Sequence, residues 1–387
     1  MTKRMNGVDW LLLGAVLLLC LLGTLLVWSA TSTRDDLTGG DPKAYLEKQV
    51  VNVAIGLVLM LVVMATDHRW VRILAPLFYA VSVAGLVLVL TMGTTVNGSR
   101  SWLMLGGLSI QPSEFAKLAV VIGMALVVAE RCEGRWRARV GIVDVTMMLA
   151  VAALPTALIL LQPDLGTMLV LAATVFGVLA AAGAPRRWLG LLAVGGAAAA
   201  LAAVSAGWLK DYQLDRFLAF TNPALDPRGA GYNVEQARIA VGNGGLFGQG
   251  LFDGSQTRSG FVPEQHTDFV FTVAGEELGL VGAALIVALL GIVIWRALAI
   301  ATRTDDVFGR VAAAGIACWF GFQAFQNVGM CLGIMPVTGV PLPFVSYGGS
   351  SMFAGMLALG LLQNVHLRAS AALPTRLLAS PRVLASR

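Results

Sequence analysis

A run of polar and ionisable residues at 262–269 (VPEQHTDF) stands immediately before a long apolar segment. Pro263 cannot lie inside a helix, and Thr267 is a residue type that often caps a helix N-terminus. The pattern therefore predicts a helix start here, with Asp268 in the first turn, where the helix dipole stabilises an ionised carboxylate. Such an aspartate either acts as a general base towards a nearby hydroxyl or does no more than cap its helix. His266 in the same run is a candidate supporting residue.

A second polar element runs from 97 to 117 and carries both signs of charge. Pro112 and Ser113 predict a helix start, so Glu114 and Lys117 stand three residues apart on one face of that helix. Lys117 would lie about one turn into the apolar region. At that depth an ionisable residue either has a function or is satisfied by snorkelling and by its own ion pair. The candidate site residues in this element are Arg100, Trp102, Glu114 and Lys117.

Two further elements interrupt apolar segments. In 161–167 (LQPDLGT), Asp164 is either a turn residue that caps the next helix or part of a polar site. The loop at 335–351 is rich in proline and ends in small residues before the last apolar segment, which is hard to explain as a simple connector. Glu276 and Glu277 follow Asp268 on its expected helix, and for both we expect a structural role in pairing with a neighbouring helix.

The elements that position these residues must be membrane-spanning helices. The chain has 387 residues, of which 57% are hydrophobic and only 13% are charged, whereas soluble domains carry roughly 25% charged residues. The composition predicts an all-α polytopic membrane protein with ten transmembrane helices, because lipid offers no partner to unpaired backbone groups. The expected spans lie near 10–30, 48–66, 71–92, 113–130, 141–161, 167–184, 188–207, 268–296, 309–334 and 351–367.

Charge places the polar elements relative to the membrane. Lys and Arg gather in alternate connections, so the positive-inside rule puts both termini in the cytoplasm. The same arrangement explains the net charge of +5 without nucleic acid as a partner. The four cysteines are scattered and predict packing residues rather than metal ligands or disulfides. We expect one transmembrane domain over 1–370 and a basic cytoplasmic tail over 371–387.

The long connection at 208–266 then lies outside the cytoplasm, between the seventh and eighth helices. Aromatic residues recur along it, and 231–241 predicts a short amphipathic helix that can lie on the membrane surface. The other polar elements end on the same outer face. A transporter concentrates polar groups near the bilayer midplane, so this placement favours chemistry on a lipid-linked polar substrate.

From the first to the tenth expected helix, the chain resembles the SEDS family of membrane proteins (shape, elongation, division and sporulation). The motifs that carry the resemblance are 262–269 with its continuation GEELG at 275–279, QPDLGT at 162–167, and the loop at 336–351. Within the family, Gln162 and the sequence MPVTGVPLP at 335–343 favour an elongation member over a division member.

The resemblance implies a peptidoglycan glycosyltransferase that polymerises lipid II on the outer face of the bacterial cytoplasmic membrane, with undecaprenyl diphosphate as leaving group. It also implies a class B penicillin-binding protein as the partner that supplies transpeptidation. Asp268 occupies the position of the family's essential aspartate, and Asp164 falls in its QPD turn. The family's other polar cluster matches Arg100, Trp102, Glu114 and Lys117.

As a hypothesis for the reaction, Asp268 is the general base for the acceptor hydroxyl, and Lys117 and Arg100 stabilise the diphosphate. Diphosphate chemistry also leads us to expect a divalent cation, Mg or Mn, whereas no His or Cys cluster in the sequence indicates zinc. A lipid II flippase and a scaffold that only recruits the penicillin-binding protein remain as alternatives. They differ from the enzyme in making no glycan product.

Overall fold

The computed structural model describes residues 7–96, 99–105, 108–132, 140–207, 213, 214, 216, 219, 220, 222, 226 and 229–379. Its long helices are α2 (Trp10–Ser32), α4 (Ala44–Ala65), α5 (His68–Met92), α6 (Pro112–Cys132), α7 (Ile142–Leu161), α8 (Leu165–Ala182), α9 (Arg186–Ser205), α14 (Gly279–Arg303), α15 (Val307–Cys331) and α16 (Gly349–Ala379). Nine of these, within the described residues, are long and apolar enough to cross a membrane. The tenth, α16, is also long but carries Gln363 and Asn364 among its apolar residues. The predicted all-α membrane fold is confirmed.

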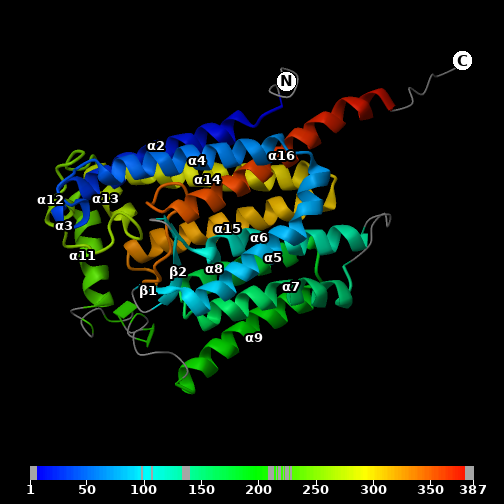
Figure 1. Cartoon of the computed structure of the whole chain (residues 1–387), viewed down its shortest axis with the longest axis horizontal. Coiled ribbons are helices and arrows are strands. Elements are labelled where there is room, and N and C mark those ends of the chain that lie inside the picture. The colour runs from blue at the N-terminus through cyan, green and yellow to red at the C-terminus, as the bar shows by residue number, and fades with distance from the viewer. Residues whose placement is uncertain are drawn as a thin grey trace, which may run out of the picture.

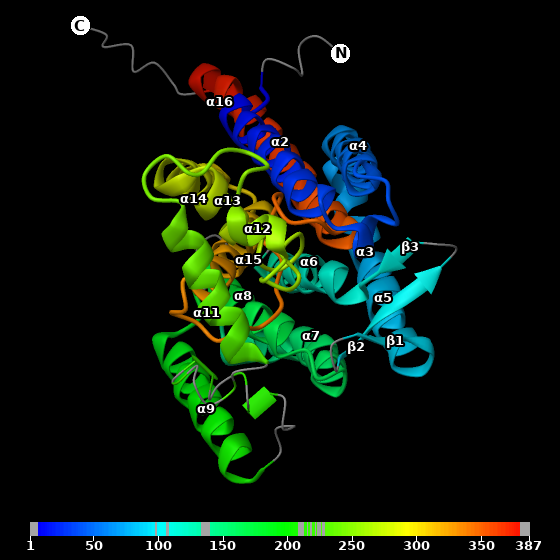
Figure 2. The same cartoon turned by 90° about the vertical axis from the view of Figure 1, so that its left-hand side faces the viewer.

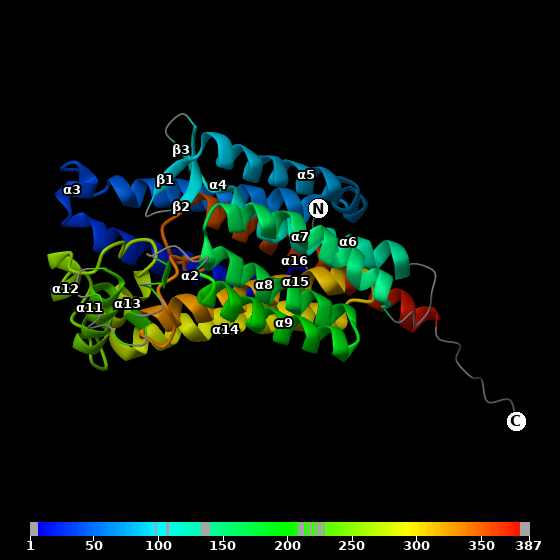
Figure 3. The same cartoon turned by 90° about the horizontal axis from the view of Figure 1, so that it is seen from below.

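The helices run side by side as one bundle with α15 near its centre (Figure 1). Helix α15 packs against α14, α8 and α6, and most of its residues are buried. The strands and α11–α13 gather at one end of the bundle, on the left in Figure 1, and α16 ends at the opposite end (Figure 3). Helix α9 lies at the periphery and has no buried residue. Gly195 and Gly196 of α9 have no other atom within 4 Å of an added Cβ, so this stretch does not pack against another helix of the chain.

The expected eighth span, 268–296, is broken in the structure. Helix α13 (Val270–Glu277) ends before Gly279, whose φ of +66° suits glycine, and α14 then begins. The loop at 245–250 docks at this break. The last carbonyls of α13 accept hydrogen bonds from the amides of residues 249 and 250, and the first amides of α14 donate to the carbonyls of residues 245 and 246. The loop thus satisfies the backbone groups that the break exposes.

A short antiparallel sheet, which the all-α prediction missed, follows α5. Strands β1 (Thr94–Val96), β2 (Ser99–Leu105) and β3 (Leu108–Ile110) pair in chain order. The strands are so short that their pattern does not stand out beside the apolar helices. The sheet lies at the C-terminal end of α5 and brings residues of β2 to the site described below.

Three short helices complete the same end of the bundle: α3 (Asp35–Thr38), α11 (Ala230–Asn243) and α12 (Ser255–Ser259). The helix predicted at 231–241 is α11. Its buried residues Val234, Ala237 and Ala240 face α13 and α15, so α11 is part of the protein's packed core (Figure 2). Much of the long connection at 208–228 lies outside the described residues.

Candidate active site

A cavity of about 170 Å³, which we call cavity A, opens where the polar elements meet. Its lining includes three carboxylates, one guanidinium and two large rings: Asp164, Glu264, Asp268, Arg216, Trp102 and Tyr347. Hydroxyl groups supply much of the rest, from Ser99, Ser101, Thr267, Thr338, Ser350 and Ser351. Hydroxyls and an indole ring are groups that bind sugars by hydrogen bonds and apolar contact.

A second cavity of about 410 Å³, cavity B, lies beside the first and is lined by residues of α11 together with the 263–269 turn. The two cavities share Arg216, Glu264, Asp268 and Gly339. Asp268 is thus accessible from both sides.

The setting of Asp268 differs from the predicted one. Helix α13 begins at Val270 with Phe269 at the N-cap, and Thr267 donates to the carbonyl and carboxylate of Glu264. Asp268 therefore lies in a turn before the helix, not in its first turn. Burial, and then the charge of Glu264, raise the pKa of the half-buried Asp268 to about 7, against the lowering effect of Arg216. A carboxyl with this pKa is a stronger base than an ordinary aspartate and is about half ionised at neutral pH.

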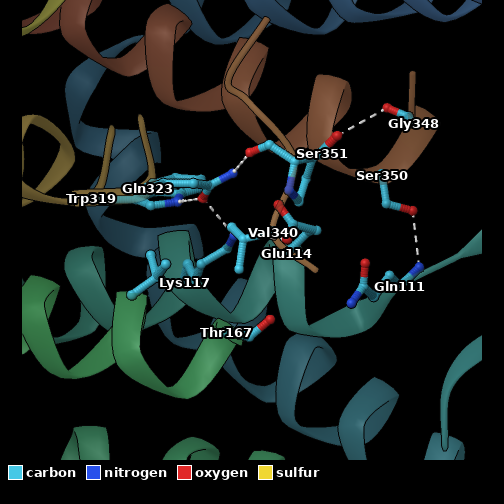
Figure 4. Close-up of polar contacts among 12 residues, drawn as sticks. Gln111, Glu114, Lys117, Thr167, Trp319, Gln323, Val340, Gly348, Ser350 and Ser351 are labelled. Atoms are coloured by element: carbon cyan, nitrogen blue, oxygen red, sulfur yellow. Dashed lines mark hydrogen bonds and ion pairs between the residues drawn. The ribbon is translucent and has the colours of Figure 1, made fainter. Parts of the chain in front are cut away.

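Asp164 combines both of the roles considered for it. Its carboxylate caps α8 by accepting from the amide and the hydroxyl of Thr167, at 3.0 and 2.8 Å, and it also lines cavity A. Gln111, just before α6, donates its side-chain amide to Asp164 at 3.4 Å and its backbone amide to Ser350 Oγ at 2.9 Å (Figure 4). The N-terminal ends of α6, α8 and α16 are joined at the cavity by these contacts.

Lys117 and Glu114 form the predicted i,i+3 pair at 2.7 Å, but both side chains are buried and neither lines cavity A or cavity B. Lys117 Nζ also donates to Gln323 Oε1 at 2.8 Å and lies over the Trp319 ring (Figure 4). The structure therefore does not place Lys117 against a substrate diphosphate. Its donors are satisfied within the protein.

Arg100 is also not brought to the cavity. Its guanidinium donates to the carbonyls of residues 90, 91 and 93, and so caps the C-terminal end of α5. The cation that does line both cavities is Arg216, which the sequence reasoning missed. No feature of the sequence separates Arg216 from the other basic residues of the long connection, Lys210, Arg228, Arg238 and Arg258.

His266 is buried beside the cavity rather than in its lining. Its ring lies edge-on to Tyr45 at 5.0 Å, and its carbonyl accepts from the amide of Tyr347 at 2.9 Å. Burial lowers the pKa of His266, so the neutral ring is the form that packs here. Its contacts link the 263–269 turn to the Pro-rich loop.

The three cavity carboxylates supply the oxygen ligands that Mg²⁺ and Mn²⁺ prefer. Among the described residues, however, no three His, Cys, Asp or Glu side chains converge into a preformed metal cluster. A cation at this site would therefore need further oxygen ligands from a bound anionic substrate.

The sequence matches a protein family described as "Cell cycle protein" (FtsW/RodA/SpoVE) over residues 9–371. Among curated proteins, the peptidoglycan glycosyltransferase MrdB of Escherichia coli (strain K12) is 37% identical over 354 residues. The aligned residues cover 91% of this chain and 91% of that protein. Stage V sporulation protein E of Bacillus subtilis (strain 168) is 36% identical over 372 residues, which cover 94% of this chain and 98% of that protein. A probable peptidoglycan glycosyltransferase FtsW of Trichlorobacter lovleyi is 38% identical over 94% of both.

Comparison with solved structures finds similar proteins. A chain from the structure described as "Structural coordination of polymerization and crosslinking by a peptidoglycan synthase complex" aligns with a TM-score of 0.75 at 35% identity, covering 94% of this chain and 98% of that one. The rod shape determining protein RodA of Thermus thermophilus aligns with a TM-score of 0.67 at 33% identity, with 93% and 96% covered. The chain is a polytopic membrane protein that belongs to the FtsW/RodA/SpoVE, or SEDS, family.

Proposed function

We propose that this protein is a peptidoglycan glycosyltransferase that polymerises lipid II on the outer face of the bacterial cytoplasmic membrane during cell elongation. The observation that carries the proposal is the Asp268 carboxylate, which lies between two cavities at the end of the bundle opposite the end of α16. Two relatives that are 37% and 38% identical over more than nine-tenths of this chain bear the name peptidoglycan glycosyltransferase or probable peptidoglycan glycosyltransferase.

In the proposed reaction, the 4-hydroxyl of the acceptor saccharide attacks the anomeric carbon of the donor. The new C–O bond forms as the bond to the diphosphate breaks, and undecaprenyl diphosphate leaves with the bonding electrons. The ionised carboxylate of Asp268 takes the proton of this hydroxyl. Direct displacement inverts the anomeric configuration of the donor.

The leaving diphosphate requires positive charge, and Arg216 is the described cation that lines both cavities. We propose that Asp164 and Glu264 together with the diphosphate hold a divalent cation, Mg or Mn. Such a cation, when bound, supplies Lewis-acid stabilisation of the leaving group. Removal of divalent cations with EDTA should then lower turnover, and Mg²⁺ or Mn²⁺ should restore it.

We further propose a class B penicillin-binding protein as partner and a location in the cytoplasmic membrane with both termini in the cytoplasm. The partner is supported by the structural likeness to a chain of a peptidoglycan synthase complex. The orientation is supported by the gathering of Lys and Arg in alternate connections.

The test is polymerisation of lipid II by the purified protein with its partner, followed by separation of glycan strands on a gel. Asp268→Ala should lower the rate by about 100-fold or more, because it removes the general base. Asp253→Ala is the matched control, since Asp253 is exposed in the same outer region. Transport of lipid II across vesicles without glycan product would replace the enzyme by a flippase. Normal strand synthesis by Asp268→Ala would leave only a scaffold role for this site.

A further inference from the structure

Helix α15 carries three side-chain amides on one face, at positions 323, 326 and 327. Gln323, Gln326 and Asn327 are all buried, with exposed fractions of 3%, 0% and 0%. The spacing of three and four residues brings them to the same side of the helix. Buried amides are costly in an apolar helix unless they find hydrogen-bond partners.

Each amide nitrogen donates to the segment around the active site. Gln323 Nε2 donates to the Pro341 carbonyl at 2.8 Å, and Gln326 Nε2 donates to Thr338 Oγ1 at 2.7 Å. Asn327 Nδ2 donates to the Val340 carbonyl and also to the carbonyl of Asp268, both at 2.7 Å. The row of amides therefore holds the loop at 338–341 against α15.

Asn327 joins the two segments that matter for the proposed reaction. Its NH₂ group has two hydrogens, and the two carbonyls use both of them. One carbonyl belongs to Asp268, and the other follows Gly339, which lines both cavities beside the Asp268 carboxylate. Asn327, which lines neither cavity, thus ties the Asp268 main chain to the loop.

The orientation of Gln323 is set in turn by Lys117. Gln323 Oε1 accepts from Lys117 Nζ at 2.8 Å and from the indole N–H of Trp319 at 2.7 Å (Figure 4). Both partners are donors only, so the oxygen must face them and the nitrogen must face Pro341. Lys117, itself paired with Glu114, therefore acts on the loop through Gln323.

We propose that Asn327 and Gln323 are positioning residues that hold the Asp268 turn and the 338–341 loop in register, and that the buried Lys117–Glu114 pair acts through Gln323. The inference rests on the proposed glycosyltransferase function. In this inference, Lys117 and Glu114 affect the loop through Gln323 and do not contact the substrate.

The test compares Asn327→Leu with Asn364→Leu in the full-length protein. Asn364 is a matched control because it is a buried amide that donates to the carbonyls of Val63, Met64 and Thr66, and it lines neither cavity. Both variants should lower the melting temperature. Only Asn327→Leu should lower kcat for lipid II polymerisation, by about 10- to 100-fold, since misplaced catalytic groups cost rate on this scale. The KM for lipid II should stay close to the wild-type value, because Asn327 lines neither cavity.

Gln323→Glu serves as a second variant in case Asn327→Leu fails to fold. The carboxylate still accepts from Lys117 and Trp319 but cannot donate to Pro341, so kcat should fall in a protein whose Lys117 remains paired. A folded variant of either kind with unchanged kcat would overturn the inference. If the wild-type protein makes no glycan, or Asp268→Ala makes as much as wild type, the proposed function fails instead.

Discussion

Asp268 shows how burial changes the chemistry of a single residue. At the start of a helix the carboxylate would be stabilised in its ionised form and would be a weak base. In the turn before α13 it is half-buried beside Glu264, and its pKa is raised to about 7. The same carboxylate is therefore a base matched to neutral pH, whose activity should depend steeply on pH.

We expect the polymerisation rate to rise with pH through about 7 and to level off above it, because only ionised Asp268 accepts the proton. Glu264 raises the pKa of Asp268 by its negative charge, so Glu264→Gln should move the midpoint to lower pH. The measurement is kcat/KM against pH, from about 5.5 to about 8.5. A midpoint that stays in place or moves up would contradict this electrostatic role. Asp253→Asn is the control, because Asp253 is an exposed acid that is not among the charges acting on Asp268.

Gly339 is a second residue whose type is required by its position. Its φ is +69°, and a methyl group added to it would lie 3.2 Å from Asp268 Oδ2. Gly339→Ala should cost about 1 kcal/mol of stability and also lower kcat. Gly183 has a φ of +83° with open space around it. Gly183→Ala should therefore lower the stability by a similar amount but leave the kcat for lipid II polymerisation unchanged. Equal turnover of the two variants in a lipid II assay would refute the link between Gly339 and Asp268.

At the scale of elements, the site is assembled by loops that dock on helix ends. The break between α13 and α14 receives the 245–250 loop, and the Pro-rich loop is held by the amides of α15. Glu277 accepts from Ser29 Oγ of α2 at 2.6 Å, which confirms that it pairs with a neighbouring helix. Glu276 instead binds α12, a short helix in the long connection before α13.

Glu276 holds α12 through four hydrogen bonds. Its carboxylate accepts from the amides of Gln256 and Thr257 and from the hydroxyls of Ser255 and Thr257. Glu276→Gln replaces one accepting oxygen by a donor, so the first turn of α12 should open and its amides at 256 and 257 should exchange faster with solvent. Hydrogen exchange followed by mass spectrometry measures this. The matched variant Glu235→Gln on α11 should leave these amides unchanged; protection equal to wild type in Glu276→Gln would refute the capping role.

At the scale of the whole molecule, the polar residues of the site come from segments more than 250 residues apart in the chain. Ser99 and Trp102 of β2, Asp164 before α8 and Ser350 of α16 line the same cavity as Asp268. They meet because each segment ends at the same end of the bundle (Figure 1). The orientation of the bundle in the membrane then decides on which side the reaction takes place.

The orientation predicts the labelling of introduced cysteines. In a Cys132→Ser background, Phe247→Cys should react with a membrane-impermeant maleimide in intact spheroplasts, because Phe247 is 81% exposed at the outer end. Arg187→Cys, in the first turn of α9, should react only after the membrane is permeabilised. The reverse pattern would place cavities A and B on the cytoplasmic side and would end the proposal of lipid II polymerisation outside the cytoplasm.

The sequence by itself determined the membrane fold, the helix positions and the motifs that meet at the site, because apolar length and turn residues are local properties. Tertiary structure alone decided how the ionisable residues are used. Lys117 and Arg100 have the charge that a diphosphate requires, yet their donors are satisfied by Gln323 and by α5 carbonyls, while Arg216 takes the place at the cavity. Burial, hydrogen-bond partners and the pKa of Asp268 depend on contacts between distant segments, and such contacts have no local signature in the chain.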